Sequence, residues 1–253
     1  MKDEIEQAAG LTAQAQQVVV FTGAGVSKES GLPTFRDAQE GLWAKYDPEE
    51  LASLEGFRRK PELVWTWYQH RRTLYGDVQP NPGHLAIAEL ETLVPRVVVI
   101  TQNVDNLHRR AGSTDIIELH GNIYRFKCLD EGRRMKLNEL EQTDDAPPHC
   151  PHCGSLVRPD VVWFGEYLPA GALERAIHES RQCDVMLVVG TSAVVQPAAL
   201  LPFEAANHGA SIIEVNPNPS GATRIADLFL QGPSGEVLPQ VLDELRRRGV
   251  SEQ

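Results

Sequence analysis

The sequence lacks the features that mark membrane, secreted and nucleic-acid-binding proteins. No apolar run approaches the roughly 18 residues that a membrane span requires, and the charged N-terminus MKDEIEQAAG has no apolar signal core. Lys and Arg number 24 against 35 Asp and Glu, a net charge of −11, and they form no basic stripe. We therefore expect a cytoplasmic protein that binds neither a membrane nor nucleic acid, and we further expect a monomer.

Cysteine is also scarce. The four cysteines, Cys128, Cys150, Cys153 and Cys183, are too few to form a disulfide scaffold in a chain of 253 residues. Cys150 and Cys153 form a C-x-x-C pair, which indicates a metal or redox site in a reducing compartment. Cys183 precedes an apolar run and is expected to be an inert, buried thiol.

Apolar runs alternate with helix-like segments along most of the chain. Runs rich in β-branched residues occupy 18–23, 96–105, 115–121, 185–192 and 211–219. Helix-like segments occupy 61–77, 83–94, 170–181, 197–208 and 235–248. This alternation predicts an α/β fold, a Rossmann-like parallel sheet with helices on both faces. Polar residues end each run, and ligands of such folds bind at the carboxyl ends of the strands.

One stretch breaks this pattern. Residues 122–160 hold three of the four cysteines and the sequence PPHCPHCG, but no long apolar strand. Modules with so few apolar residues are often held together by a metal. We therefore predict a Rossmann-like domain formed by 1–121 and 161–253, with a small zinc-ribbon-like module, 122–160, inserted into it.

A glycine-rich turn, FTGAGVSKESGLPTFR, follows the first predicted strand. Gly23 and Gly25 begin a dinucleotide-binding fingerprint, but Lys28 stands where its third glycine should be, and the Gly-Lys-Ser/Thr end of a Walker loop is absent. Phe35 and Arg36 supply a ring and a guanidinium that suit a nucleotide. The stretch predicts a nucleotide site of another kind, the alternative being a tight turn without a ligand.

Several motifs together resemble the sirtuins, the NAD-dependent protein deacylases. GAGVSKESGLPTFR resembles their NAD-binding signature and TQNVD at 101–105 their second signature, and LHG at 119–121, GTS at 190–192 and VNPN at 215–218 follow in the family's order. The resemblance covers nearly the whole chain. It implies that NAD is consumed as a co-substrate and that acylated lysine side chains of proteins are the other substrate.

The resemblance assigns NAD contacts to the polar residues at the strand ends. The phosphates and adjoining ribose fall to Gly23, Ala24, Gly25, Ser27 and Ser192, the nicotinamide half to Phe35, Arg36, Gln102, Asn103 and Asp105, and the adenosine half to Gly190, Thr191, Asn216, Asn218 and Ser234. Taken singly, an Asn after a strand is more often a turn residue. The agreement of several strand ends favours a ligand.

His120 ends the third predicted strand, where the family has its general base. A histidine can accept a proton near neutral pH, although an isolated one is more often structural. In the implied reaction, the acyl oxygen attacks the nicotinamide ribose and expels nicotinamide. His120 then deprotonates a ribose hydroxyl, which attacks the imidate, and water releases lysine and O-acyl-ADP-ribose.

The resemblance also implies where the acyl-lysine binds, in a cleft between the domain and the module. The stretch VVWFGE at 161–166, which contains Val162 and Phe164, would pair as a strand with the substrate peptide, and Val194 lies on the facing edge. A plain buried strand is the alternative.

Tyr68 and Arg71 indicate which acyl group is removed. They lie at i and i+3 of WTWYQHRR and resemble the Tyr-x-x-Arg signature of sirtuins that remove succinyl and malonyl groups. A guanidinium can pair with the acyl carboxylate, and a phenol can add a hydrogen bond. Ala38 is small, as a roomy acyl pocket requires, and acetyl-lysine should still fit. The alternative is that Arg71 is one more solvated charge.

The cysteine module departs from the family. Sirtuins usually carry two C-x-x-C pairs, a pattern typical of structural zinc. Here Cys150 and Cys153 form the second pair, but the first has only Cys128. We predict zinc on these three thiolates, with a fourth ligand among Asp130, Glu131, His149 and His152. A redox pair is the alternative, although the surrounding prolines favour a rigid knuckle.

Three other functions would also use NAD. A dehydrogenase would need the complete glycine fingerprint, a mono-ADP-ribosyltransferase would release nicotinamide without an acylated peptide, and a non-enzymatic NAD sensor would not need His120 and Asn103. NAD binding alone does not separate these functions, so the reaction itself must be tested.

Overall fold

The structure, a computed structural model, describes residues 2–32, 48–136, 139–140 and 146–249. Three predicted site residues, Phe35, Arg36 and Ala38, lie outside the described residues. Within the described ranges, no helix is both long enough and apolar enough to cross a membrane.

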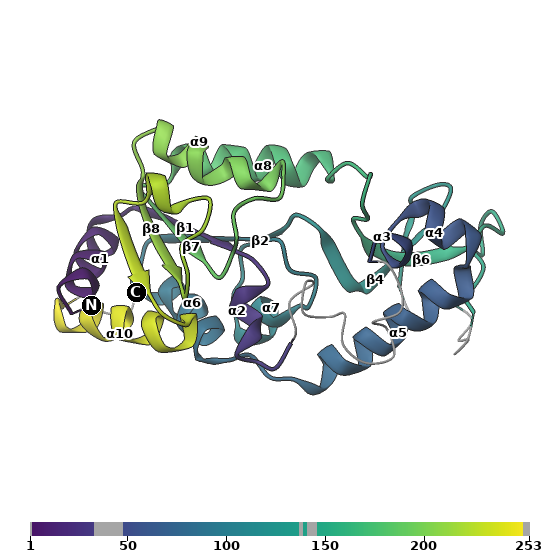
Figure 1. Ribbon diagram of the computed structural model, residues 1–253, viewed down its shortest axis with the longest axis horizontal. Helices are drawn as coiled ribbons and strands as arrows, with labels where there is room; N and C mark the ends of the chain where they lie inside the picture. Colours follow the sequence, from purple (N-terminus) through teal and green to yellow (C-terminus); the bar gives the residue numbers. More distant parts are fainter. Residues whose placement is uncertain (1, 33–47, 137–138, 141–145, 250–253) are drawn as a thin grey trace.

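Six parallel strands form the main sheet, in the order β3-β2-β1-β7-β8-β9 (Figure 1). Their bounds are β1 Gln17–Thr22, β2 Arg96–Thr101, β3 Ile116–Glu118, β7 Val185–Val189, β8 Ser211–Asn216 and β9 Leu228–Gln231. The first five coincide with the five predicted runs, which confirms the α/β fold. The sequence does not predict β9, because this edge strand has only four residues and one of them alone is fully buried.

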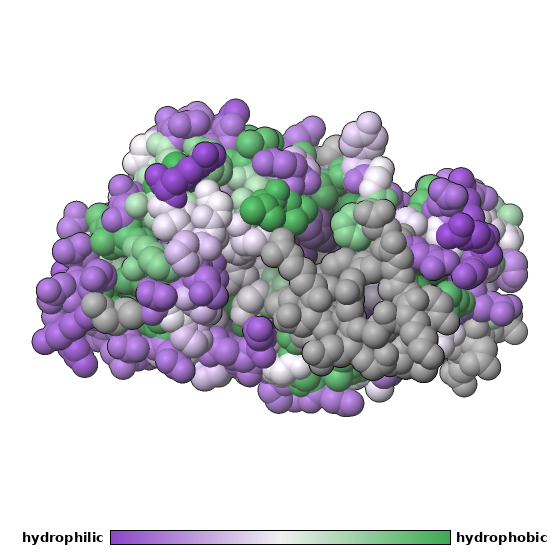
Figure 2. All heavy atoms as spheres, in the orientation of Figure 1, coloured by the Kyte–Doolittle hydropathy of each residue, from purple (hydrophilic) through white to green (hydrophobic). Residues whose placement is uncertain are grey.

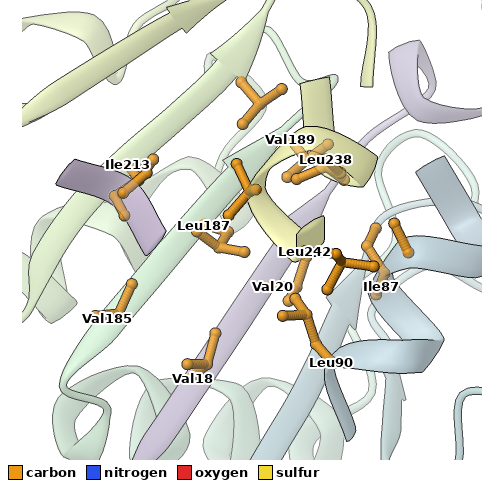
Figure 3. Packing of buried hydrophobic residues seen from close by; sticks show 14 of the residues in the cluster. Val18, Val20, Ile87, Leu90, Val185, Leu187, Val189, Ile213, Leu238 and Leu242 are labelled. Carbon is orange, nitrogen blue, oxygen red and sulfur yellow. The ribbon is translucent and has the colours of Figure 1, made fainter. Parts of the chain in front are cut away.

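Side chains of the main sheet point alternately into two cores, one on each face. Val18 and Val20 of β1 belong to the core covered by α1 Lys2–Gln14, α6 Pro82–Leu93 and α10 Ser234–Arg247 (Figure 3). Val19 and Phe21 belong to the other core, which lies beneath α8 Ala170–Gln182 and α9 Leu201–Asn207 (Figure 1). Because both faces are covered, the strands are continuous apolar runs instead of alternating ones.

A second, antiparallel sheet has the strand order β5-β4-β6. It consists of β4 Gly121–Cys128, β5 Arg134–Met135 and β6 Val157–Val161, and it packs with α3 Pro48–Leu51, α4 Leu54–Arg59 and α5 Pro61–Asp77. We call these three strands and three helices the small unit, which lies at the right of Figure 1. Phe57, Trp67, Ile123 and Trp163 share its core.

The strands of the small unit differ from the sequence prediction in two ways. β4 is an eight-residue strand that the sequence did not predict: it lies almost wholly in the stretch without a long apolar strand, because its apolar residues are interrupted by polar ones. The plain buried strand that was the alternative for 161–166 is not found, since Phe164 forms an isolated parallel bridge with Ser53 and β6 ends at Val161. After it, Gly165 has φ +82° and the Glu166 carboxylate accepts from the Trp163 N–H, so the chain turns.

Short helical segments follow several strands of the main sheet. They are α2 Gly25–Lys28 after β1, α7 Leu107–Ala111 after β2, the 3₁₀ helix η3 Ala198–Leu200 after β7 and the 3₁₀ helix η4 Thr223–Ile225 after β8. Most of the predicted NAD residues lie between the end of one of the strands β1, β2, β7 and β8 and the short helix that follows it.

Candidate active site

The strands β1, β2, β7 and β8 are neighbours and end at the same edge of the main sheet. Gln102 Nε2 donates to Thr191 Oγ1 at 2.9 Å. Asn103 Nδ2 donates to the carbonyl oxygen of Gly23 at 3.0 Å, and Asn216 Nδ2 donates to that of Thr191 at 2.8 Å. The four loops that follow these strands therefore meet, as the polar strand ends lead us to expect.

Gly25 and Gly190 allow the loop after β1 to pass directly against the loop after β7. The Gly25 N–H donates to the Gly190 carbonyl oxygen at 2.7 Å, and a Cβ on Gly25 would lie 2.6 Å from that oxygen. Gly190 has φ +58°, and a Cβ there would lie 2.2 Å from the Val26 nitrogen. These glycines therefore meet a backbone requirement in addition to their expected contact with NAD.

Ser27 and Asp105, both predicted to contact NAD, are buried and bond to each other. Ser27 Oγ donates to Asp105 Oδ2 at 2.7 Å and accepts from Asn103 Nδ2 at 3.1 Å. Burial raises the pKa of the Asp105 carboxyl, against the lowering effect of hydrogen bonds from the Leu107 N–H and from Ser27. Both side chains therefore join the loops after β1 and β2 from the inside.

His120 is half-buried and has one ring nitrogen fixed. Its Nδ1 lies 2.9 Å from the Gln102 carbonyl oxygen. A carbonyl only accepts, so Nδ1 carries the proton and Nε2 keeps its lone pair. Burial lowers the pKa of His120, and the bond to Gln102 offsets this only in part. The imidazole is therefore neutral at pH 7 and can accept a proton at Nε2.

Tyr68 and Arg71 lie side by side on α5 of the small unit. The buried Tyr68 hydroxyl accepts from Trp163 Nε1 at 2.8 Å. Burial raises the pKa of Tyr68 to about 12, so the phenol stays protonated and keeps a hydrogen to donate. The Arg71 guanidinium lies over the rings of Trp67, at 4.6 Å, and Tyr68, at 5.7 Å. In the part of the chain that the structure describes, Arg71 forms no ion pair.

Three cysteines and one carboxylate form a compact cluster in the small unit. The ligand atoms of Cys128, Glu131, Cys150 and Cys153 all lie within 4.8 Å of one another. Cys128 Sγ and Cys153 Sγ are 3.4 Å apart. Three thiolates and a carboxylate at this spacing suit a tetrahedral metal site. Of the four candidate fourth ligands, Glu131 alone joins the described cluster; His149 instead bonds through Nδ1 to the Gly154 carbonyl oxygen.

Comparison with known proteins identifies the family. Residues 23–197 match the sequence model of the Sir2 family. NAD-dependent protein deacylase 2 of Pyrobaculum aerophilum is 52% identical over 240 residues, which are 95% of this chain and 95% of that protein. This chain belongs to the Sir2 family.

Two solved Sir2 structures have the same fold as this sirtuin. One, the complex of a Sir2 homologue with NAD, has a TM-score of 0.90 and 46% identity and covers 97% of this chain and 95% of that one. The other is a Sir2 protein bound to a myristoylated histone peptide, with a TM-score of 0.78 and 40% identity, and it covers 98% of this chain and 99% of that one.

The other predicted NAD residues of this sirtuin differ in exposure. Ala24, Ser192 and Asn218 are exposed in their loops. Ser234 begins α10 and is buried, and its hydroxyl donates to Glu29 Oε1 at 3.1 Å. A hydrogen bond from this hydroxyl to the adenine would therefore compete with its bond to Glu29.

The predicted peptide-binding residues of this sirtuin lie on two separate segments. Phe164 is 51% and Val194 55% exposed, as an apolar contact with a peptide requires. Val162 donates its N–H to the His120 carbonyl oxygen at 2.9 Å, which ties this segment to the expected base. On the face drawn in Figure 2, apolar side chains lie near the middle and also in the left part, among hydrophilic ones.

Sequence reasoning missed four buried residues of this sirtuin site: His84, His108, Trp163 and Tyr75. The rings of His84 and His108 lie 4.9 Å apart, and burial lowers their pKa values to about 4 and about 3. His84 Nε2 faces Ser27 Oγ at 3.4 Å, and His108 Nε2 faces Thr22 Oγ1 at 2.9 Å. Only the closeness of His108 to the TQNVD motif could have drawn attention to either histidine.

Proposed function

We propose that this sirtuin removes succinyl and malonyl groups, as well as acetyl groups, from lysine side chains of proteins. Its class, an NAD-dependent protein deacylase, follows from identity of about half over nearly the whole length of a relative of that name. The acyl group is transferred to ADP-ribose and nicotinamide is released. The observation that carries the acyl preference is the Arg71 guanidinium: among the described residues no carboxylate lies within ion-pair distance of it, and Asp105 acts on it only from farther away.

The surroundings of Arg71 favour an anionic ligand. Its guanidinium lies among aromatic faces, which attract a cation but do not neutralise it. A second arginine nearby shows the contrast: Arg158 is buried and pairs with Glu166 through Nη2 and Oε2 at 2.9 Å. The terminal carboxylate of a succinyl or malonyl group would pair with the Arg71 guanidinium as the Glu166 carboxylate pairs with that of Arg158.

The residues of the main sheet support the transfer step. NAD, when bound, supplies the ribose that accepts the acyl group. Asn103 and Gln102 would hold the nicotinamide half, since their side chains stand at the meeting point of the loops. His120 Nε2 would accept the proton of a ribose hydroxyl, because its Nδ1–H is engaged by a carbonyl and its ring is neutral.

We further propose that the metal of the small unit is zinc, held by Cys128, Glu131, Cys150 and Cys153. Thiolate ligands favour zinc over magnesium or calcium. Four protein ligands leave no open position, which is typical of a structural zinc site. The site would join the turn after β4 to the knuckle at 150–153.

The acyl preference is tested with paired peptides that carry acetyl-lysine or succinyl-lysine at the same position. In the presence of NAD, mass spectrometry should show removal of both groups and the formation of O-succinyl-ADP-ribose. Arg71→Met should lower kcat/KM for the succinyl peptide about a hundredfold more than for the acetyl peptide, because a charge-assisted bidentate pair is lost.

The matched control is Arg72→Met. The Arg72 guanidinium lies 4.6 Å from the ring of Phe126, so its loss should leave the ratio of the two activities unchanged. An equal loss on both peptides in Arg71→Met would refute the acid pocket. Cleavage of NAD without any change in either peptide would favour a transferase instead.

A further inference from the structure

A third residue of α5 completes the surroundings of Arg71. Tyr75 follows Arg71 by four positions, so both lie on the same face of the helix. Its phenolic oxygen accepts from Arg71 Nε at 3.1 Å and from Arg71 Nη2. Tyr75 is 6% exposed, and its ring lies 5.1 Å from the Arg71 Cζ atom.

The two hydrogen bonds occupy one particular edge of the guanidinium. A carboxylate can approach Arg71 along the side edge, formed by Nε and Nη2, or along the end edge, formed by Nη1 and Nη2. The Tyr75 oxygen takes the side edge. The end edge, with one hydrogen on each terminal nitrogen, remains for a ligand.

Tyr75 is itself held in place by neighbouring elements. Its backbone carbonyl accepts from Arg110 Nη1 of α7 at 3.0 Å. One turn earlier, the Arg72 carbonyl oxygen accepts from the Tyr124 hydroxyl of β4 at 3.3 Å. The end of α5 is therefore anchored both to the segment that follows the Asp105 loop and to the sheet of the small unit.

We propose that Tyr75 is a positioning residue that determines acyl specificity: its phenol holds the side edge of Arg71 and presents the end edge to the terminal carboxylate of the acyl group. The inference rests on the proposed deacylation of succinyl- and malonyl-lysine. It adds a residue that does not touch the substrate but sets the direction in which Arg71 binds it.

Removal of the Tyr75 hydroxyl should therefore affect binding of acidic acyl groups alone. In Tyr75→Phe, Nε and Nη2 of Arg71 lose their acceptor, and the guanidinium can turn and become hydrated. We expect the KM for a succinyl-lysine peptide to rise about tenfold, as the loss of a hydrogen bond to a charged group allows. The kcat on that peptide, and both constants on the acetyl-lysine peptide, should stay as in the wild type.

Tyr124→Phe is the matched control, since it also deletes one phenolic hydroxyl that bonds to α5. It should leave the ratio of succinyl to acetyl activity unchanged. Tyr75→Gln, whose amide oxygen can accept from Arg71, should restore part of the ratio lost in Tyr75→Phe. In an Arg71→Met background, Tyr75→Phe should change the ratio no further. Thermal unfolding of every variant checks that the fold is intact.

The outcomes separate this inference from the function on which it rests. If Arg71→Met lowers the ratio but Tyr75→Phe does not, or if Tyr75→Phe lowers both activities equally, the role of Tyr75 is refuted and the acid pocket stands. If Arg71→Met itself leaves the ratio unchanged, both proposals fall. A selective rise in KM in Tyr75→Phe, absent from Tyr124→Phe, supports both.

Discussion

His120 owes its chemical form to a single backbone neighbour and to burial. The Gln102 carbonyl fixes the Nδ1–H tautomer, and burial keeps the ring neutral by lowering its pKa. Both effects leave the Nε2 lone pair available at neutral pH. As the proposed general base, His120 therefore needs no further proton transfer within the protein before it acts.

The pH dependence of kcat/KM should reflect this lowered pKa. The active form of His120 is the neutral one, so activity should be full above the pKa and fall below it. The acidic limb should therefore lie below about 6.5, the ordinary value for histidine. An acetyl-lysine peptide without other titrating groups is the suitable substrate, and a limb above 6.5 would contradict the structure. His120→Ala should abolish turnover while calorimetry still detects NAD binding.

The sequence could predict which strand ends form the site, but not the contacts between individual side chains there. The strand-end pattern correctly brought Gly23, Asn103, Thr191 and Asn216 together, because parallel strands end at one edge. It could not show that Ser27 donates to a carboxylate 78 residues away. Partners of that kind depend on loop geometry and not on local pattern.

The helix α10 begins without a capping side chain of its own. Pro233 occupies the cap position, and the carboxylate of Glu29, at the end of α2, supplies the missing acceptor. Glu29 Oε1 accepts from the Gly235 N–H at 2.9 Å and from Ser234 Oγ at 3.1 Å. A negative charge at this end also suits the helix dipole. The glycine-rich loop after β1 is thus joined to the C-terminal helix.

Glu29→Ala should lower the free energy of unfolding by about 1 kcal/mol, as the loss of a helix cap does. Urea denaturation followed by circular dichroism measures the change. Glu236→Ala is the control: this exposed acid belongs to the first turn of α10, but its carboxylate has no hydrogen-bond partner within the described residues. An equal effect of both variants would mean that charge alone, and not the bonds of Glu29, stabilises α10.

Among the helices and strands, sequence periodicity predicted those that are long and buried. The five predicted strands of the main sheet and the helices α5, α6, α8, α9 and α10 all exist. The helix α1 was not predicted, since KDEIEQAAGLTAQ buries only Ile5 and three small residues. The alternating pattern also suggested that α5 covers the main sheet. It packs instead in the small unit, because Trp67 and Tyr68 join the core of β4 and β6.

At the scale of the whole molecule, the main sheet and the small unit differ in how much apolar side chain they bury. The main sheet is covered on both faces by continuous apolar layers. The small unit has, beside its larger cluster, a minor one in which Trp65, Phe126 and Val157 pack directly against Cys128 and Cys150. A cluster of this size contributes little stability by itself, so a metal would add a substantial share.

Removal of zinc by a strong chelator should therefore destabilise the small unit before the main sheet. Calorimetry should show a separate transition at lower temperature, and Glu131→Ala should weaken zinc retention about tenfold or more. Asp130→Ala is the control, because this neighbouring carboxylate lies outside the cluster. The measurement is the zinc content of each protein after dialysis. Equal loss of zinc from both variants would exclude Glu131 as a ligand. A wild-type protein without zinc would exclude the site.

The position of α5 has a consequence for the way such enzymes diverge. The helix that carries Tyr68, Arg71 and Tyr75 packs in the small unit, and the loops proposed to hold NAD follow strands of the main sheet. With the proposed acyl pocket, mutations on one helical face would change which acyl group is removed and leave the proposed NAD loops unaltered in sequence. Related enzymes that share this fold would in this way differ in the acyl group that they remove from lysine, each through substitutions on a few turns of one helix.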